Sequence, residues 1–356
     1  MSGGGIGARL REFVKVPWAG GVAAILLLLV IDTIRDPGYL GVYVNPDTGH
    51  LVGNLIDILR AAAPVLMISV GMVLVIATSG IDLSVGSVMA VAGAASMQFL
   101  SDASAPDSLP AALTALALAL GMGALCGAVN GALVSFVRLQ PFISTLIMML
   151  AARGLAKVVT SGQNARATNA PFRWIANGYV GGFPVVFVIA VLVVVAVALV
   201  VRRTALGLMV ESIGIDLKAA RLAGLNQRAL LMTVYIGSGL LAAAAGVFAT
   251  SSVMVVDVSN TGYQLEMDAI LAVVIGGTSL AGGKFSISGA TVGALLIVTL
   301  DKTVVFLGVP SSATPAFKAA IIIVLCLLQS QRVREPLAKL RSKLRPAGPE
   351  PKGVAA

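Results

Sequence analysis

Charged side chains are scarce in this sequence. Asp, Glu, Lys and Arg make up 12% of its 356 residues, whereas hydrophobic residues make up 58%. A soluble domain contains about 25% charged residues, and a chain this apolar cannot hide its hydrophobic side chains in a soluble core. Uncharged runs at 112–137 and 185–201 approach or exceed the roughly 20 residues that cross a bilayer as a helix. The composition therefore predicts a polytopic membrane protein.

Residues suited to catalysis or metal binding are equally few. The only histidine, His50, lies in a predicted loop, and the two cysteines, Cys126 and Cys326, lie in apolar runs far apart in the sequence. Cysteines in such runs are more often small buried hydrophobic residues than metal ligands or disulfide partners. We therefore expect no catalytic set, no metal site and no cofactor, which argues against a membrane-embedded hydrolase.

A complete phosphate-binding loop is also missing, although one glycine-rich stretch suggests it at first sight. The segment 273–285, VVIGGTSLAGGKF, contains Gly283-Lys284, but Thr278 replaces the first glycine of the motif and Phe285 replaces its hydroxyl residue. The motif needs backbone amides at the glycines to wrap the phosphates and a hydroxyl group to hold Mg²⁺. We interpret the stretch as a turn between two apolar segments, and we expect the chain not to bind ATP itself.

The apolar runs predict an all-α fold of about ten transmembrane helices. Pro64 should kink the second helix, and the segment 268–281 is short for a membrane crossing, so some helices should be kinked or broken. Irregular backbone at membrane depth needs surrounding protein or a water-filled cavity. The expected helices lie near residues 18–35, 54–79, 84–100, 111–137, 141–160, 183–201, 229–250, 268–281, 288–308 and 314–331.

Basic residues are distributed unevenly around these helices. Most of the 25 Lys and Arg residues fall in the N-terminal segment 1–17, the loop 202–228 and the tail 332–356. By the positive-inside rule, both termini and this loop face the cytoplasm, with a transmembrane domain at 18–331. The net charge of +9 then reflects membrane boundaries, and we expect no nucleic-acid partner. The predicted outer loops without any Lys or Arg are 36–52, 101–110 and 251–267.

Acidic residues have no convincing position inside a predicted membrane segment. Asp82, Glu211, Asp216 and Asp268 fall at predicted helix ends or in loops. A carrier driven by protons or sodium ions usually needs an intramembrane carboxylate or an unwound ion site. The energy for any transport should therefore come from a source outside this chain.

Four polar residues are candidates for lining a translocation path. Gln98, Asn130 and Thr145 lie inside apolar runs, where they could bind a polar substrate or could join helices to one another. Asp82 is expected either as a fixed joint beside the path or as the N-cap of the third helix.

The largest predicted inner loop, 204–229, contains a short helix. Asp216 is a natural N-cap, LKAARLA (217–223) favours a helix, and Gly224 suits the position that follows its C-terminus. Ile213, Leu217 and Ala220 are expected to share one face. Two interpretations remain open, an amphipathic helix that rests on the membrane surface or a docking helix for a cytoplasmic protein.

Three stretches together resemble the permease subunits of ribose/galactose-type ABC sugar importers, the carbohydrate uptake class 2. The resemblance covers roughly residues 55–330, and RAAAPVLMISVGMVLVIATSGIDLSVG (60–86) with VLCLLQSQR (324–332) is most similar to the galactofuranose type. In the third stretch, Glu266-Met267 stand in place of the family's usual first residues. The stretches are GIDLSVGSVMAVAGA (80–94); Gly207, Ile213-Gly214, Ala219-Ala220 and Gly224 before VYIGSGLLAAAAGVF (234–248); and EMDAILAVVIGGTSLAGGKF (266–285).

The resemblance implies a permease subunit in the bacterial inner membrane that passes a pentose or hexose inward and has no catalysis of its own. Besides the lipid bilayer, it implies a cytoplasmic ABC ATPase, a periplasmic sugar-binding protein and a second permease subunit, identical or different. The alternatives are a related ABC permease for branched-chain amino acids and a membrane enzyme or scaffold that transports nothing. The residues expected to couple to the ATPase are Gly207, Glu211, Ile213, Gly214, Leu217, Ala219, Ala220 and Gly224.

Overall fold

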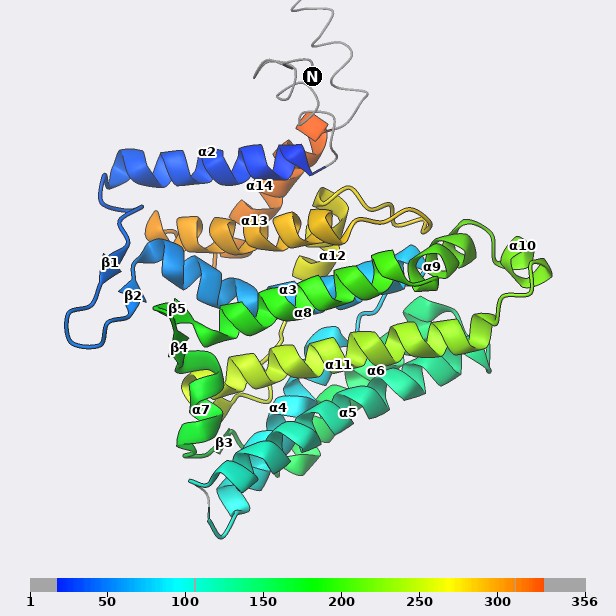
Figure 1. Cartoon of the computed structure of the whole chain (residues 1–356), viewed down its shortest axis with the longest axis horizontal. Helices are drawn as coiled ribbons and strands as arrows, with labels where there is room; N and C mark the ends of the chain where they lie inside the picture. The colour runs from blue at the N-terminus through cyan, green and yellow to red at the C-terminus, as the bar shows by residue number, and fades with distance from the viewer. Residues whose placement is uncertain (1–17, 106, 311, 330–356) are drawn as a thin grey trace, which may run out of the picture. The chain divides into compact units, whose positions relative to one another are not determined.

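The computed structural model describes residues 18–105, 107–310 and 312–329, and helices dominate it (Figure 1), which confirms the all-α prediction. The predicted cytoplasmic segments 1–17 and 332–356 lie outside the described residues. The chain divides into two compact units, 1–303 and 304–356. The helices are α2 (Ala19–Arg35), α3 (Asn54–Ala77), α4 (Val85–Asp102), α5 (Leu109–Ser135), α6 (Pro141–Val159), α7 (Ala170–Asn177), α8 (Val185–Arg203), α9 (Leu206–Ile215), α10 (Leu217–Leu222), α11 (Gln227–Val253), α12 (Leu265–Ile275), α13 (Ile287–Phe306) and α14 (Thr314–Gln329).

Each of the ten predicted transmembrane segments overlaps one of these helices. Within the described part of the chain, six helices are long and apolar enough to cross a membrane, namely α3, α5, α6, α8, α11 and α13. Helix α2 has 17 residues and α12 has 11, so ten full crossings remain a prediction. Helix α12 ends earlier than expected because Gly276 and Gly277 follow it, and Gly277 has a φ of +90°, outside the helical region.

Two helices were not predicted as separate elements, α7 and α9. Helix α7 begins after Asn169, whose side-chain oxygen accepts a hydrogen bond from the amide of Phe172 (2.7 Å). An asparagine cap followed within two residues by Pro171 is a helix-start signal that the sequence does contain. Helix α9 occupies the first part of the predicted inner loop, so this loop is mostly helical.

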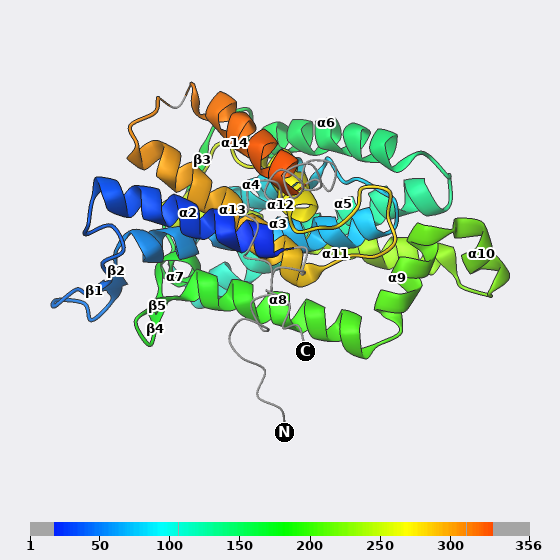
Figure 2. The ribbon, with the colours of Figure 1, turned by 90° about the horizontal axis from the view of Figure 1, so that it is seen from above.

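Three antiparallel pairs of two-residue strands tie the loops together. β1 (Tyr43–Val44) pairs with β2 (Leu51–Val52), and β4 (Tyr179–Val180) pairs with β5 (Phe183–Pro184). The third pair joins distant segments, β3 (Ala165–Arg166) and β6 (Val255–Val256), with Ala165 opposite Val256. Strands β1, β2, β4 and β5 lie at the end of the first unit opposite to α9 and α10 (Figures 1 and 2).

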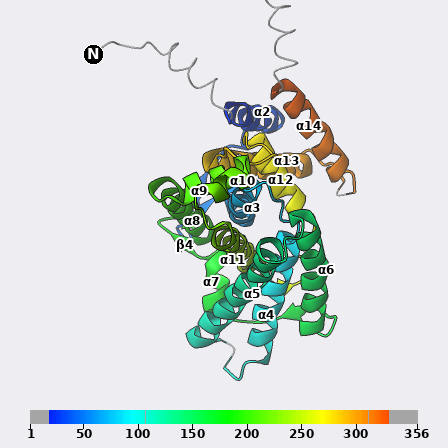
Figure 3. The same cartoon turned by 90° about the vertical axis from the view of Figure 1, so that its right-hand side faces the viewer.

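Helix α11 occupies the centre of the first unit. It packs against α3, α4 and α5, and the view in Figure 3 shows it between α3 and α5. Gly123 and Gly127 of α5 meet Tyr235 and Gly239 of α11 so closely that a Cβ atom at Gly127 would overlap the carbonyl oxygen of Tyr235. In a membrane, helices associate by van der Waals packing of small residues, because lipid tails are as apolar as leucine.

Large apolar side chains on α5, α6 and α8 point away from the interior of the first unit. Leu113 and Leu125 of α5, Ile147 of α6 and Leu192 and Leu199 of α8 are all exposed. A soluble monomer rarely exposes apolar surface of this extent. This surface suits contact with lipid tails or with a neighbouring membrane subunit.

We predict that Gly127→Ala lowers the thermal stability of the purified protein, because the added methyl group overlaps the α11 backbone and overpacking costs about 1–3 kcal/mol. The control is Gly121→Ala in the same helix, where a Cβ atom meets nothing within 4 Å. Alanine is the better helix former, so the control should keep or slightly raise the melting temperature. Equal melting temperatures for the two variants in detergent would contradict the close α5–α11 contact.

Candidate functional site

The segment between α8 and α11 forms two short helices separated by Asp216. Asp216 Oδ1 accepts hydrogen bonds from the amides of Lys218 (2.7 Å) and Ala219 (3.0 Å), which confirms Asp216 as the N-cap of α10. At the other end, Gly224 has a φ of +81° and its amide donates to the Arg221 carbonyl. The predicted glycine terminator is therefore also confirmed, and α10 is capped at both ends.

The predicted shared face of this segment is wrong. Ile213 and Ala220 are only 2% and 3% exposed and pack inside the chain, whereas Leu217 is 49% exposed. The reason is the extended residue Asp216, which breaks the helix so that the helical spacing of side chains does not continue from α9 into α10. The outward apolar surface is instead formed by Ile215, Leu217 and Leu222, of which Leu222 is 90% exposed.

The remaining residues of the predicted coupling set occupy different surroundings. Gly207 is buried against Val201 of α8, where a Cβ atom would overlap the Val201 carbonyl oxygen. Glu211 is half-buried on α9, whereas Ala219 and Gly224 are exposed on and after α10. The set is thus divided between buried residues, which include Ala220 of α10, and exposed residues on and after α10.

Helix α9 is joined to the α3–α4 link and to the glycine-rich turn before α13. A Cβ atom at Gly214 would overlap both the Ala77 carbonyl oxygen and the Gly283 amide, and that amide donates to Ala77 O (3.0 Å). Ser79 Oγ lies 2.9 Å from the carbonyl oxygens of both Gly214 and Ala281. We call this junction of Ala77, Ser79, Gly214, Ala281 and Gly283 the α9 clamp. It gives the stretch 273–285 a structural role, because its glycines allow backbones to meet.

A buried polar network connects the α3–α4 link to three helices. Asp82 Oδ1 accepts hydrogen bonds from the amide (3.0 Å) and hydroxyl (2.6 Å) of Ser84, and Asp82 Oδ2 accepts one from Ser238 Oγ of α11 (2.8 Å). Asn130 Nδ2 of α5 donates to Ser84 Oγ (2.9 Å). Thr145 Oγ1 of α6 donates to the carbonyl oxygen that precedes Asp82 (3.0 Å). Buried polar groups of this kind fix the positions of the helices that carry them.

Three of the four candidate path residues, Asp82, Asn130 and Thr145, therefore meet in one network and are buried within the chain. Gln98 lies apart, where its Nε2 donates to Asp102 Oδ2 (2.9 Å) on the exposed side of α4. The N-cap prediction for Asp82 was wrong, because Ser84 occupies that position and Asp82 bonds to it from two residues earlier. Whether these residues line the path stays a prediction.

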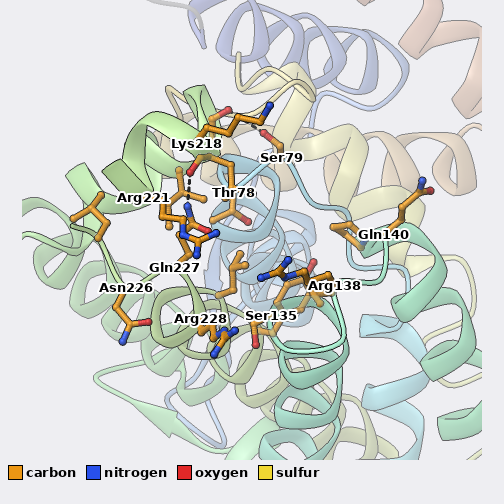
Figure 4. A pocket seen from close by; sticks show the side chains of 18 of the residues that line it. Thr78, Ser79, Ser135, Arg138, Gln140, Lys218, Arg221, Asn226, Gln227 and Arg228 are labelled. Carbon is orange, nitrogen blue, oxygen red and sulfur yellow. Dashed lines mark hydrogen bonds between the residues drawn. The ribbon is translucent and has the colours of Figure 1, made fainter. Parts of the chain in front are cut away.

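A cavity of about 930 Å³ opens beside α10 (Figure 4). Its wall comes from the α3–α4 link, the α5–α6 link, α9, α10 and the start of α11. Four basic residues line it, Arg138, Lys218, Arg221 and Arg228, and its lining contains no Asp or Glu. In the sequence, Arg138 lies 80 or more residues before the other three, so only the fold brings the four basic residues together.

A second, smaller pocket lies at the opposite end of α3 and α11. The pocket has a volume of about 210 Å³, and its lining includes Asp57 and Arg60 of α3 and Lys302 of α13. Arg60 Nη2 donates to the hydroxyl group of Tyr179, and His50 stacks on the Tyr179 ring with centroids 3.8 Å apart. These charges precede or follow long apolar runs, and sequence reading passed over them.

One carboxylate does lie inside an apolar helix, contrary to the expectation from the sequence. Asp32 of α2 is buried, and its Oδ2 accepts a hydrogen bond from Thr303 Oγ1 of α13 (2.6 Å). Its position within AGGVAAILLLLVIDTIR was the signal that could have revealed it. The pairing with Thr303 ties α2 to α13, which is a structural use of the carboxylate.

The chain matches, over residues 54–327, the family described as the permease component of the branched-chain amino acid transport system. The protein belongs to this permease family. It is similar to the fructose import permease protein of Bifidobacterium longum, with 52% identity over 94% of this chain and 93% of that protein. The galactofuranose transporter permease protein of Escherichia coli is 41% identical over 90% of this chain and 92% of its own length. The ribose import permease protein of the same organism is 37% identical over 87% and 92%.

No solved structure matches the chain. Membership of this family makes the protein a multi-pass transport subunit of a bacterial inner membrane and not an enzyme.

We predict that Gly214→Ala disrupts the α9 clamp, because the new methyl group overlaps backbone atoms of two other segments. Thermal stability of the purified permease should fall by about 1–3 kcal/mol. Gly237→Ala in α11, where a Cβ atom meets nothing within 4 Å, is the matched control and should leave stability unchanged. If Gly214→Ala were as stable as this control, the backbone contacts at Ala77 and Gly283 would not be essential.

Proposed function

We propose that this protein is the permease subunit of an ATP-driven importer that passes a monosaccharide across the bacterial inner membrane. The relatives with 37–52% identity over nearly their full lengths are import permeases for fructose, galactofuranose and ribose. The family title mentions branched-chain amino acids, but this identity to sugar permeases favours a sugar. Fructose and galactofuranose, both hexoses, are the first candidates to test.

The protein works with three kinds of partner. They are an ABC ATPase in the cytoplasm, a sugar-binding protein in the periplasm and another permease subunit. We propose that the exposed apolar surface on α5, α6 and α8 is shared between lipid and the second permease subunit.

We propose that α10 is the helix that contacts the ATPase. The structure of α10 itself supports this proposal. It is capped at both ends by Asp216 and Gly224, it exposes Leu217 and Leu222, and it connects through α9 to the α9 clamp. A short rigid helix with outward leucines offers an apolar contact to a partner protein. The clamp would then carry a displacement of α10 to the link between α3 and α4, and from there to the polar network at Asp82.

The docking interpretation of α10 is favoured over a helix that only rests on the lipid surface. Lys218 and Arg221 of α10 line the cavity, so one side of this helix faces an open space and not the lipid surface. An ATPase that contacts Leu222 would reach the cavity without crossing lipid.

We predict that Leu222→Glu blocks association with the ATPase, because it places an unpaired charge in an apolar contact. Sugar uptake into reconstituted vesicles and co-purification of the ATPase should both fall at least tenfold, with membrane levels unchanged. Leu222→Met keeps the apolar surface and should behave as the wild type. The exposed Leu222 is the suitable position, since a change at the buried Ala220 would also disturb the packing of the chain itself. Normal uptake by Leu222→Glu would remove α10 from the coupling mechanism.

The proposed orientation has both termini and the α9–α10 segment in the cytoplasm. We predict that Lys218→Cys, in a background with both native cysteines replaced by alanine, resists a membrane-impermeant maleimide applied to intact spheroplasts. Asp47→Cys, in the exposed β1–β2 turn at the opposite end, should react. The reverse pattern of labelling would invert the orientation.

A further inference from the structure

The cavity beside α10 has an unbalanced charge. Arg138 from the α5–α6 link, Lys218 and Arg221 from α10 and Arg228 from the start of α11 all line it, and Figure 4 shows their side chains around one space. Since no carboxylate belongs to this lining, the four cations repel one another. The guanidinium carbon of Arg228 lies 5.6 Å from the centroid of the Phe136 ring. A cavity of this kind attracts an anion.

The backbone fixes the position of Arg138 at this cavity. Arg138 has a φ of +63° just after the end of α5. The amide of Leu139 donates to the Leu133 carbonyl oxygen (3.0 Å), so the left-handed conformation at Arg138 closes the C-terminus of α5. One of the four cations is therefore held where a helix end sets the course of the chain.

Two residues of the same lining carry buried hydroxyl groups without a hydrogen-bond partner among the described residues. Tyr235 and Ser135 both border the cavity, and both are buried. Neither hydroxyl oxygen has a hydrogen-bond partner among the described residues. A buried polar group without a partner lowers stability, so a ligand that pairs with it is favoured. The four cations suit a carboxylate ligand, and a hydroxyl group that becomes accessible when a partner docks could donate to it.

We propose that this cavity, lined by Arg138, Lys218, Arg221 and Arg228, receives acidic side chains of the ABC ATPase subunit. The inference rests on the proposed coupling role of α10 and adds the chemistry of the contact. The ATPase is favoured as the source of the anion because α10 supplies Leu217, Lys218 and Arg221 to the cavity wall. Any protein segment inside the cavity therefore touches α10. A carboxylate there neutralises the cations and gives docking a strong dependence on ionic strength.

The test measures the affinity of the purified ATPase for the permease reconstituted in phosphatidylcholine nanodiscs, over a range of sodium chloride concentrations. The cavity variant is Arg138→Gln with Arg228→Gln. The matched control is Arg202→Gln with Arg203→Gln, which removes the same charge from two exposed residues at the end of α8 that do not line the cavity. We expect the wild type and the control to bind alike and to weaken as salt rises. The cavity variant should bind at least tenfold more weakly, with a much flatter salt dependence.

A second variant, Tyr235→Phe, removes one unpaired hydroxyl group without changing charge. The isolated permease should keep or gain thermal stability, because a buried donor without a partner is lost. Its affinity for the ATPase should nevertheless fall several-fold, because the carboxylate loses a hydrogen bond. A fall in affinity for the ATPase without a fall in thermal stability distinguishes a docking contact from a general loss of structure. Unchanged affinity of Tyr235→Phe would remove Tyr235 from the contact.

The outcomes distinguish this inference from the proposed function. Equal affinity of the cavity variant and the control, while Leu222→Glu abolishes binding, overturns the acidic contact and leaves the coupling role of α10 intact. Loss of binding in neither the cavity variant nor Leu222→Glu contradicts both. A difference that appears only in nanodiscs containing phosphatidylglycerol would assign the cavity to a lipid headgroup and would overturn the ATPase contact.

Discussion

Close contact between helix backbones is the constraint on which the structure depends. Within a bilayer, apolar side chains gain little by leaving lipid for protein, so the helices must gain stability by fitting tightly. Helix α11 achieves this against α5, where Gly123, Gly127 and Gly239 let the backbones touch. A side chain of any size at these positions would separate the helices. The high content of glycine, 39 residues, therefore serves packing as well as turns.

The same principle extends beyond the helix bundle to the segment proposed to meet the ATPase. Gly214 on α9 and Gly283 in the turn before α13 allow three distant parts of the chain to share one junction, where the Ser79 hydroxyl group donates to the carbonyl oxygens of Gly214 and Ala281. Because backbone atoms of Ala77, Gly214 and Gly283 meet directly in this junction, it has little freedom to slide. In the proposed coupling mechanism, this junction would pass a displacement of α10 through α9 to the α3–α4 link. That link contains Asp82 and Ser84, which hold α5 and α11 through hydrogen bonds.

This connection gives a physical account of how a chain without a phosphate-binding loop could respond to ATP hydrolysis elsewhere. The outer contact on α10 is apolar at Leu222 and basic in the adjacent cavity, so it combines two kinds of recognition. Apolar contact supplies affinity, whereas complementary charge selects the partner and speeds its approach. The buried polar network then limits which helices can follow α10, since breaking one of its members leaves another unpaired in a dry interior.

The sequence by itself determined the class of protein, the positions of most helices and the caps of α10. Those features depend on local properties, such as the length of an apolar run or the preference of Asp216 and Gly224 for helix ends. The family was also recognisable from short motifs, because they are specific as a set. Residue types alone could not reveal that Ile213 and Ala220 turn inward, since this follows from the break at Asp216 and from packing against other helices.

Only the tertiary structure brought Asp82, Asn130, Thr145 and Ser238 into one network, because hydrogen bonds between helices depend on their relative rotation and height. For the same reason, Arg138 and Arg228 read as separate loop charges in the sequence and as parts of one cavity in the fold. The glycine-rich stretch 273–285 shows what the sequence could predict and what it could not. The residue spacing alone showed that this stretch lacks a phosphate-binding motif. Its contact with α9 could be seen only in the folded chain, because the two segments are far apart in the sequence.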